Sequence, residues 1–183
     1  MKYDIHWLIN QQQKTIKYLF FWGHQPAQDG SISASCLSQW WQASFIVEGI
    51  SYPTAEHWMM AEKARLFKDM EILEKIIRAS GPAEAKKLGR KVKNFDQHLW
   101  EAQRYDIVKE GNFHKFSQHP TLKTFLLGTV GRVLVEASPV DRIWGIGMAK
   151  RDKGVENPEQ WKGLNLLGFA LMEVREMLSG STH

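Results

Sequence analysis

The stretch that decides the fold reads SYPTAEHWMMAEKARLF over residues 51–67. Pro53 ends an extended segment, and Thr54 is a good N-cap because its hydroxyl can accept a hydrogen bond from the first helical turn. The residues that follow are mostly strong helix formers. We therefore expect a helix over residues 55–67, with Glu56 in its first turn, where the helix dipole and free N–H groups favour an ionised carboxylate.

Helical patterns also dominate the sequence beyond this stretch. Asp69 can cap a second helix that ends before Gly81 and carries an apolar stripe. Three more helices are expected over residues 83–91, 96–116 and 121–127. The last helix, over residues 164–178, should carry a buried face, formed by Leu167, Leu171, Val174 and Leu178.

Strand patterns are few and short. Residues 18–22 fit a strand, and residues 44–52 fit a tight hairpin with a turn at Glu48-Gly49. Residues 130–137 are ambiguous, because their β-branched side chains favour a strand and their apolar spacing favours a helix. Residues 141–144 suggest a buried strand end. Because helices clearly outnumber strands, we expect a mainly α fold with a few short β-strands.

The length of 183 residues suits a single domain with one sizeable core. Residues 1–17 are polar, include a glutamine run at 11–13, and are interpreted as an N-terminal lead-in. Residues 18–179 are then expected to form the domain. Cys36 is the only cysteine, so an intramolecular disulfide and a multi-cysteine metal site are excluded.

The charge balance is mildly basic, with a formal net charge of +4. This favours anionic partners but is far from the dense basic stripe of a dedicated nucleic-acid binder. The one basic cluster is interpreted as a solvated helix face; it comprises Lys86, Lys87, Arg90, Lys91 and Lys93. No apolar run has the length of a membrane span, and the N-terminus lacks a signal-peptide pattern. We expect a cytoplasmic protein with no membrane partner.

Two helices carry the strongest candidates for chemistry. Glu56 and Lys63 lie seven residues apart, on one face of the first helix. The neighbouring His57 lacks a second histidine at zinc-protease spacing and is expected to be a packed or hydrogen-bonded histidine. On the helix over 96–116, a face defined by three- and four-residue steps combines an aromatic ring with cations that suit phosphate; it includes Trp100, Arg104, Ile107, Gly111 and Lys115. An ordinary acidic first turn and an ordinary amphipathic helix remain alternative explanations.

Two later segments could also contribute. Residues 141–147 read DRIWGIG and place Asp141 and Trp144 beside glycines that allow close backbone approach to a ligand. Asn165 lies near the start of the last helix, where it could cap the helix or turn its amide to a ligand. A structural turn and a simple cap are the alternatives for these two segments.

Taken together and in this order, these segments resemble the NADAR (YbiA-like) family. The resemblance runs from about residue 18 to 178, with no match over 25–41. It is carried by Phe20–Gly23, Tyr52–His57, Lys63, Trp100 with Arg104, Asn112 with Lys115-Phe116, Glu136–Ser138, Asp141–Gly147 and Gly163–Gly168.

The resemblance implies a mainly α single-domain fold and an N-glycosidase. We expect no cofactor and no metal, because the chemistry requires none and no motif supplies a metal site. The implied substrates are early ribosylamino-pyrimidine phosphates of riboflavin biosynthesis, cleaved to ribose 5-phosphate. An alternative is ADP-ribose on guanine, in which case nucleic acid is a partner only as an ADP-ribosylated substrate. A non-catalytic module that binds ADP-ribose or a nucleotide is a third reading.

Cleaving a ribosyl C–N bond builds positive charge on the sugar, which a fixed carboxylate stabilises. On this basis Glu56 and Asp141 are expected to be catalytic, with Glu56 nearest the sugar and Asp141 serving water or the ribose hydroxyls. The expected substrate-binding residues are Trp22, Lys63, Trp100, Arg104, Asn112, Lys115, Trp144 and Asn165.

Overall fold

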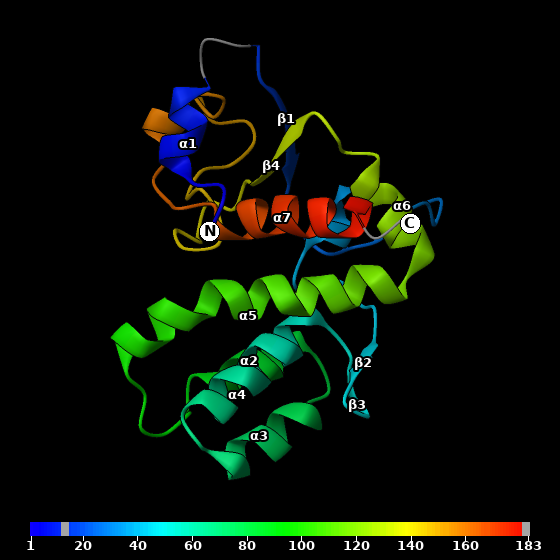
Figure 1. Cartoon of the computed structure of the whole chain (residues 1–183), viewed down its shortest axis with the longest axis vertical. Helices are drawn as coiled ribbons and strands as arrows, with labels where there is room; N and C mark the ends of the chain where they lie inside the picture. Colours follow the sequence, from blue (N-terminus) through cyan, green and yellow to red (C-terminus); the bar gives the residue numbers. More distant parts are fainter. Residues whose placement is uncertain (12–14, 181–183) are drawn as a thin grey trace. The chain divides into compact units, whose positions relative to one another are not determined.

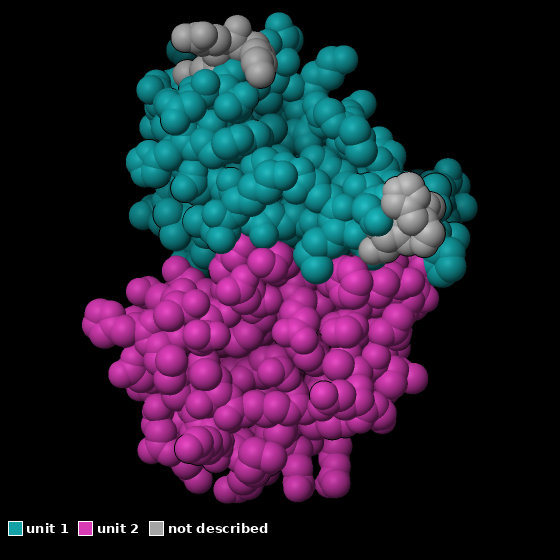
Figure 2. Space-filling model, in the orientation of Figure 1, with its two compact units in different colours: residues 1–38, 120–183 teal, residues 39–119 magenta. Residues whose placement is uncertain are grey.

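The computed structural model describes residues 1–11 and 15–180, and it divides the chain into two compact units (Figure 2). Unit 1 takes residues 1–38 and 120–183, and unit 2 takes residues 39–119. Most of the glutamine run at 11–13 lies outside the described residues. The described residues form seven α-helices, two short 3-10 helices and four strands, which confirms the mainly α fold.

Unit 2 is a helical unit with one small hairpin (Figure 1). Its elements are β2 (Phe45–Val47), β3 (Ile50–Tyr52), α2 (Ala55–Leu66), α3 (Met70–Ile77), α4 (Pro82–Gly89) and α5 (Gln97–Gln118). Helix α2 packs against α3, α4 and α5, so it is the central helix of this unit. Its buried side chains lie all around the helix, as expected for a helix surrounded by others.

The expected turn and caps of unit 2 are confirmed. The hairpin β2–β3 is antiparallel, and its turn residues Glu48 and Gly49 both have positive φ, at 50° and 80°. That combination is the backbone of a type I′ turn, whose twist matches the paired strands. Thr54 caps α2, Asp69 caps α3 and Asp96 caps α5, each by accepting a backbone N–H three residues later.

Unit 1 is built on a parallel pair of strands covered by a helix (Figure 1). Its elements are α1 (Ile5–Asn10), β1 (Lys17–Phe21), η1 (Ala34–Leu37), α6 (Pro120–Leu127), β4 (Arg132–Glu136), η2 (Pro158–Gln160) and α7 (Leu166–Gly180). The strands β1 and β4 pair in parallel from Lys17 opposite Arg132 to Phe21 opposite Glu136. The ambiguity over residues 130–137 is thus resolved as a strand.

Helix α7 packs on β4, and its predicted apolar face is confirmed by the burial of Leu167, Leu171, Val174 and Leu178. The contact is close because Gly168 has no side chain. A Cβ at this position would lie only 2.1 Å from the carbonyl oxygen of Leu134 in β4. The helix begins two residues later than expected, since Asn165 holds a left-handed backbone with φ of 53°.

The N-terminal segment belongs to unit 1. Asp4 caps α1 by accepting the N–H of Trp7, and α1 packs beside η2. Lys2 forms an ion pair of 2.7 Å with Glu176 of α7, and the Tyr3 hydroxyl donates to the same carboxylate. Lys2 and Tyr3 are therefore bonded directly to α7.

One expectation for unit 1 is wrong. Residues 141–144 form no strand end but a series of bends, with Arg142 and Ile143 exposed. The cause is the carboxylate of Asp141, whose Oδ1 accepts the N–H groups of Ile143 and Trp144, both at 2.8 Å. These two bonds curl the backbone, as Asp side chains commonly do in turns. The turn expected at the following glycines is present, with Gly147 at φ of 65°.

Among the described residues, no helix is both long and apolar enough to cross a membrane.

Candidate active site

The first turn of α2 holds a buried carboxylate. Glu56 is only 3% exposed, although its residue type is seldom buried. The cap places it there: Thr54 is extended, with φ of −143° and ψ of 164°, and its Oγ1 accepts the N–H of His57. Burial of a carboxylate is costly unless other groups compensate it, so this position is a candidate for function.

His57 has a structural role, as the sequence predicts. It is fully buried, its Nδ1 lies 2.8 Å from Thr54 Oγ1, and its Nε2 lies 3.2 Å from the carbonyl oxygen of Ala79. Burial lowers the pKa of His57 below its usual value, and the bond to Ala79 opposes this only in part. A neutral imidazole therefore joins the cap of α2 to the residues after α3.

One face of α5 is unusually polar for a buried face. Trp100, Arg104, Asn112 and Lys115 are all at least nine-tenths buried, and Asn112 and Lys115 are fully so. Arg104 also lies 3.7 Å from the exposed carboxylate of Glu101. The alternative of an amphipathic helix with solvated cations is wrong for Arg104 and Lys115. Because buried cations need compensating groups, this face is the second candidate for function.

Gln39 joins these two features and was missed by the sequence analysis. Its backbone oxygen accepts the N–H of Glu56 at 3.0 Å, and its side-chain Oε1 accepts Nδ2 of Asn112 at 2.7 Å. Asn112 Nδ2 also donates to the carbonyl oxygen of Val108. The start of α2 and the buried face of α5 are thus both hydrogen-bonded to one residue, Gln39. Gln39 lies in residues 25–41, where the sequence analysis recognised no family motif, so no sequence pattern pointed to it.

Gln39 and Asn112 each have one side-chain atom without a hydrogen-bond partner among the described residues. They are Nε2 of Gln39 and Oδ1 of Asn112, one a donor and one an acceptor. Leaving such a buried group unsatisfied costs about 1–3 kcal/mol, so it calls for an explanation. A polar ligand or water would supply the partners. We name Gln39, Glu56 and Asn112 the amide–carboxylate cluster.

Lys63 and Trp100 come together as a second group. The Lys63 ammonium lies 5.5 Å from the centroid of the Trp100 ring and 4.4 Å from that of Phe95, within range of cation–π attraction. Burial lowers the pKa of Lys63, and the nearby charge of Arg90 lowers it further. Phe95 was not predicted, since a single aromatic residue before a helix carries no distinctive signal.

The predicted residues Asp141, Trp144, Asn165 and Trp22 belong to unit 1, whereas Glu56 belongs to unit 2. Asp141 uses Oδ1 to hold its own loop. Asn165 is fully buried, and both ends of its amide bind β4: Oδ1 accepts the N–H of Glu136, and Nδ2 donates to the oxygen of Leu134, each at 3.0 Å. Asn165 therefore holds the start of α7 against β4. Its role in substrate binding stays a prediction.

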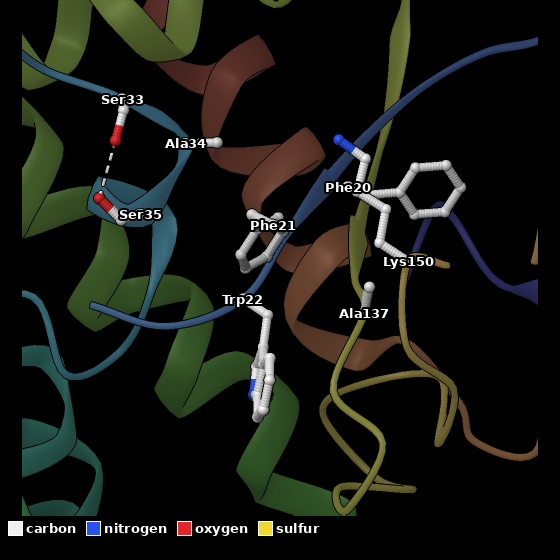
Figure 3. A pocket seen from close by; sticks show the side chains of 8 residues that line it. All are labelled: Phe20, Phe21, Trp22, Ser33, Ala34, Ser35, Ala137 and Lys150. Carbon is white, nitrogen blue, oxygen red and sulfur yellow. Dashed lines mark hydrogen bonds between the residues drawn. The ribbon is translucent and has the colours of Figure 1, made fainter. Parts of the chain in front are cut away.

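Unit 1 has a hollow of about 400 Å³ beside the end of β1 (Figure 3). It is lined by Phe20, Phe21, Trp22, Ser33, Ala34, Ser35, Ala137 and Lys150. Trp22 is 60% exposed there, while Trp144 of the same unit is half-buried. Of the unit 1 candidates, Trp22 is thus the one that lines this hollow.

Comparison with known proteins gives one consistent family. The NADAR domain model matches residues 20–179. N-glycosidase R617 of Acanthamoeba polyphaga mimivirus is 44% identical over 169 residues, covering 89% of this chain and 97% of that protein. N-glycosidase YbiA of Escherichia coli is 35% identical over 133 residues, covering 73% of this chain and 74% of YbiA.

Two further comparisons concern the fold and the chemistry. The NMR structure of E. coli YbiA matches with a TM-score of 0.69 at 28% identity and covers 91% of this chain and 89% of that one. The chloroplastic riboflavin biosynthesis protein PYRR of Zea mays is 35% identical over 138 residues, which are 72% of this chain and 20% of PYRR. The resemblance noted in the sequence therefore holds along nearly the whole chain, and the protein belongs to the NADAR family.

Proposed function

We propose that this protein is an N-glycosidase that hydrolyses the C–N bond of a phosphorylated ribosyl compound and releases ribose 5-phosphate. The names of R617 and YbiA support the reaction type. The partial match to PYRR supports an early ribosylamino-pyrimidine phosphate of riboflavin biosynthesis as the substrate. No residue of the proposed scheme requires a metal.

The observation that carries the proposal is the amide–carboxylate cluster. A carboxylate that is 3% exposed, a donor and an acceptor without partners, and two buried cations on α5 all occur in unit 2. Such a set is expensive for stability alone. It suits a substrate that has hydroxyl groups, a phosphate and a carbon that becomes positively charged.

Each group has a definite task in this scheme. Water attacks the anomeric carbon as the C–N bond breaks, and the bonding electron pair leaves with the base nitrogen, which takes up the proton that the water loses. Glu56 stabilises the positive charge on the sugar and orients the water, while the amides of Gln39 and Asn112 bind ribose hydroxyls. Arg104 and Lys115 hold the phosphate.

Other residues serve the leaving group. The ring of Trp100, beside the Lys63 ammonium, offers a stacking surface for the departing heterocycle. The family resemblance also predicts roles for two residues of unit 1: Asp141 is proposed to act on water or the ribose hydroxyls, and Trp144 is proposed as a stacking ring. These two assignments follow the family resemblance and need their own variants.

The experiment is an incubation of the purified protein with a ribosylamino-pyrimidine 5′-phosphate in the presence of a chelator, followed by mass spectrometry. We expect equimolar free base and ribose 5-phosphate. Absence of both products would contradict the proposed reaction, and activity that depends on added metal would contradict the metal-free scheme. Tight binding of the substrate without product would instead identify a binding module.

A second substrate class is ADP-ribose attached to guanine in nucleic acid. The observation in its favour is the exposed basic segment after α4, where Arg90, Lys91 and Lys93 face solvent. Contacts with phosphates release counterions, so turnover of an ADP-ribosylated oligonucleotide should fall steeply with salt. Turnover that is indifferent to salt, or no release of ADP-ribose, would exclude this class.

A further inference from the structure

His57 lies next to the proposed catalytic carboxylate and has no task in the hydrolytic scheme. It follows Glu56 directly in the first turn of α2, and it is fully buried, while Glu56 is 3% exposed. A buried polar ring beside a reactive group serves packing or holds that group in its working position. The hydrogen bonds of the ring show what it holds.

These hydrogen bonds fix the protonation of the imidazole. Nε2 lies 3.2 Å from the carbonyl oxygen of Ala79, which can only accept, so Nε2 carries a proton. Burial lowers the pKa of His57, against the opposing effects of the bond to Ala79 and of the Glu84 charge, so the ring is neutral and Nδ1 has no proton. Nδ1 lies 2.8 Å from the Thr54 hydroxyl and therefore accepts the hydrogen bond that this hydroxyl donates.

The Thr54 hydroxyl is then used in both directions. It donates its proton to Nδ1, and its oxygen accepts the backbone N–H of His57 at 3.3 Å. Thr54 is fully buried, so solvent does not compete for these bonds. The neutral ring thus sets the direction of each hydrogen bond between the Ala79 carbonyl and the cap of α2.

Glu56 lies in the turn that this link holds. In sequence it stands between Thr54, the cap, and His57, the third helical residue. Its own backbone N–H donates to the oxygen of Gln39 at 3.0 Å. The first turn of α2 is therefore attached at two separate places, to Gln39 and, through the imidazole, to Ala79. Two such attachments limit rotation of the turn about the helix axis, and with it the direction of the Glu56 side chain.

We propose that His57 is a positioning residue, whose neutral imidazole ties the Thr54 hydroxyl to the Ala79 carbonyl and thereby fixes where the Glu56 carboxylate meets the sugar. The inference rests on the proposed function, in which Glu56 acts on a ribosyl substrate. His57 acts through Glu56, since both of its ring nitrogens are already bonded within the protein. Misplacing a catalytic group by about 1 Å can cost about 10²-fold in rate, so a small shift of Glu56 is measurable.

The kinetic test is hydrolysis of a ribosylamino-pyrimidine 5′-phosphate by His57→Gln. The glutamine amide can still donate to Ala79, but it offers no acceptor where Nδ1 meets Thr54. We expect kcat to fall at least about tenfold and KM to change less than about twofold, because the binding groups stay in place. The matched control is His6→Gln, the same change at an exposed histidine of α1, which should behave as the wild type does.

Thr54 gives a second route to the same contact. Thr54→Ser keeps the hydroxyl and should keep kcat, whereas Thr54→Val removes it and should lower kcat. Combining Thr54→Val with His57→Gln should lower kcat no further than the more impaired single variant, because both changes break one and the same bond. Independent contributions would instead multiply, and this would overturn the proposal. If His57→Gln fails to fold, the contrast between Thr54→Val and Thr54→Ser still decides.

A spectroscopic measurement separates this inference from the proposed function. In protein labelled with ¹³C at the glutamate carboxyls, the Glu56 signal is identified by its loss in Glu56→Gln. It should move in His57→Gln and stay in place in His6→Gln. An unmoved signal with wild-type kcat in His57→Gln would overturn the positioning role and leave the proposed reaction standing. If the wild type releases no base, the proposed reaction is wrong, and the carboxyl signal alone decides whether His57 sets the position of Glu56.

Discussion

Replacing Gly168 by Ala should destabilise the contact between α7 and β4. The new Cβ would lie 2.1 Å from the Leu134 oxygen and 2.6 Å from the Asn165 Nδ2, so it would push apart two groups that are hydrogen-bonded to each other. Overpacking costs about 1–3 kcal/mol, and the weakened buried hydrogen bond about 1 kcal/mol. The better helix propensity of Ala offsets about 1 kcal/mol of this destabilisation. The expected net loss in the free energy of unfolding is about 2 kcal/mol.

The assay is urea denaturation followed by circular dichroism, with Gly180→Ala as the matched control. Gly180 ends the same helix, and a Cβ there would meet no atom within 4 Å. The control should therefore leave the midpoint unchanged or raise it slightly. Equal midpoints for Gly168→Ala and Gly180→Ala would refute the reasoning, because they would show that α7 does not need the close approach to β4.

Three further predictions concern single positions. Asn165→Ala should lower the free energy of unfolding by about 2 kcal/mol, because two buried hydrogen bonds are lost. The folded variant should keep its activity, because Asn165 binds β4. A folded variant without activity would instead show that Asn165 contacts the substrate. Gly111→Ala should also destabilise the protein, because the new Cβ would lie 2.3 Å from Cδ1 of Trp58 in α2. Thermal melting should show a lower midpoint, and an unchanged midpoint would mean that α5 and α2 can move apart without cost. Burial lowers the pKa of His57, so the unfolded state binds more protons and stability is lost as pH falls below the usual histidine value of about 6.5. Urea titrations from pH 7.5 to pH 5.5 measure how the free energy of unfolding changes with pH. This change should be smaller in His57→Asn than in the wild type, and an identical change would rule out the contribution of His57.

The elements of the fold could largely be predicted from local chemistry. The caps at Thr54, Asp69 and Asp96 each satisfy a backbone donor within three residues, so the sequence alone identifies the helix starts. Residues 130–137 could not be assigned, because the pairing of β4 with β1 joins segments that are more than a hundred residues apart. The bends at 141–144 were missed because the Asp141 carboxylate competes with a strand for the backbone N–H groups.

The candidate site was predicted less completely, and for a physical reason. Helical spacing identified Arg104 and Lys115 on one face of α5 but not their burial, which depends on tertiary packing. Gln39 has no local signal, since it acts through a backbone oxygen and an amide that reach two separate helices. The placement of Glu56 and Lys63 on one helix could be predicted, because it depends only on the periodicity of α2.

The most direct test of the account is the rate of base release by Glu56→Gln relative to the wild type, measured on a ribosylamino-pyrimidine 5′-phosphate. Glutamine keeps the size of the side chain and removes its charge, so the variant should fold normally. We expect a fall in kcat of at least ~10²-fold, because a charge that stabilises the transition state is lost. A folded Glu56→Gln protein that releases base at the wild-type rate would contradict the assignment of this buried carboxylate as the catalytic group.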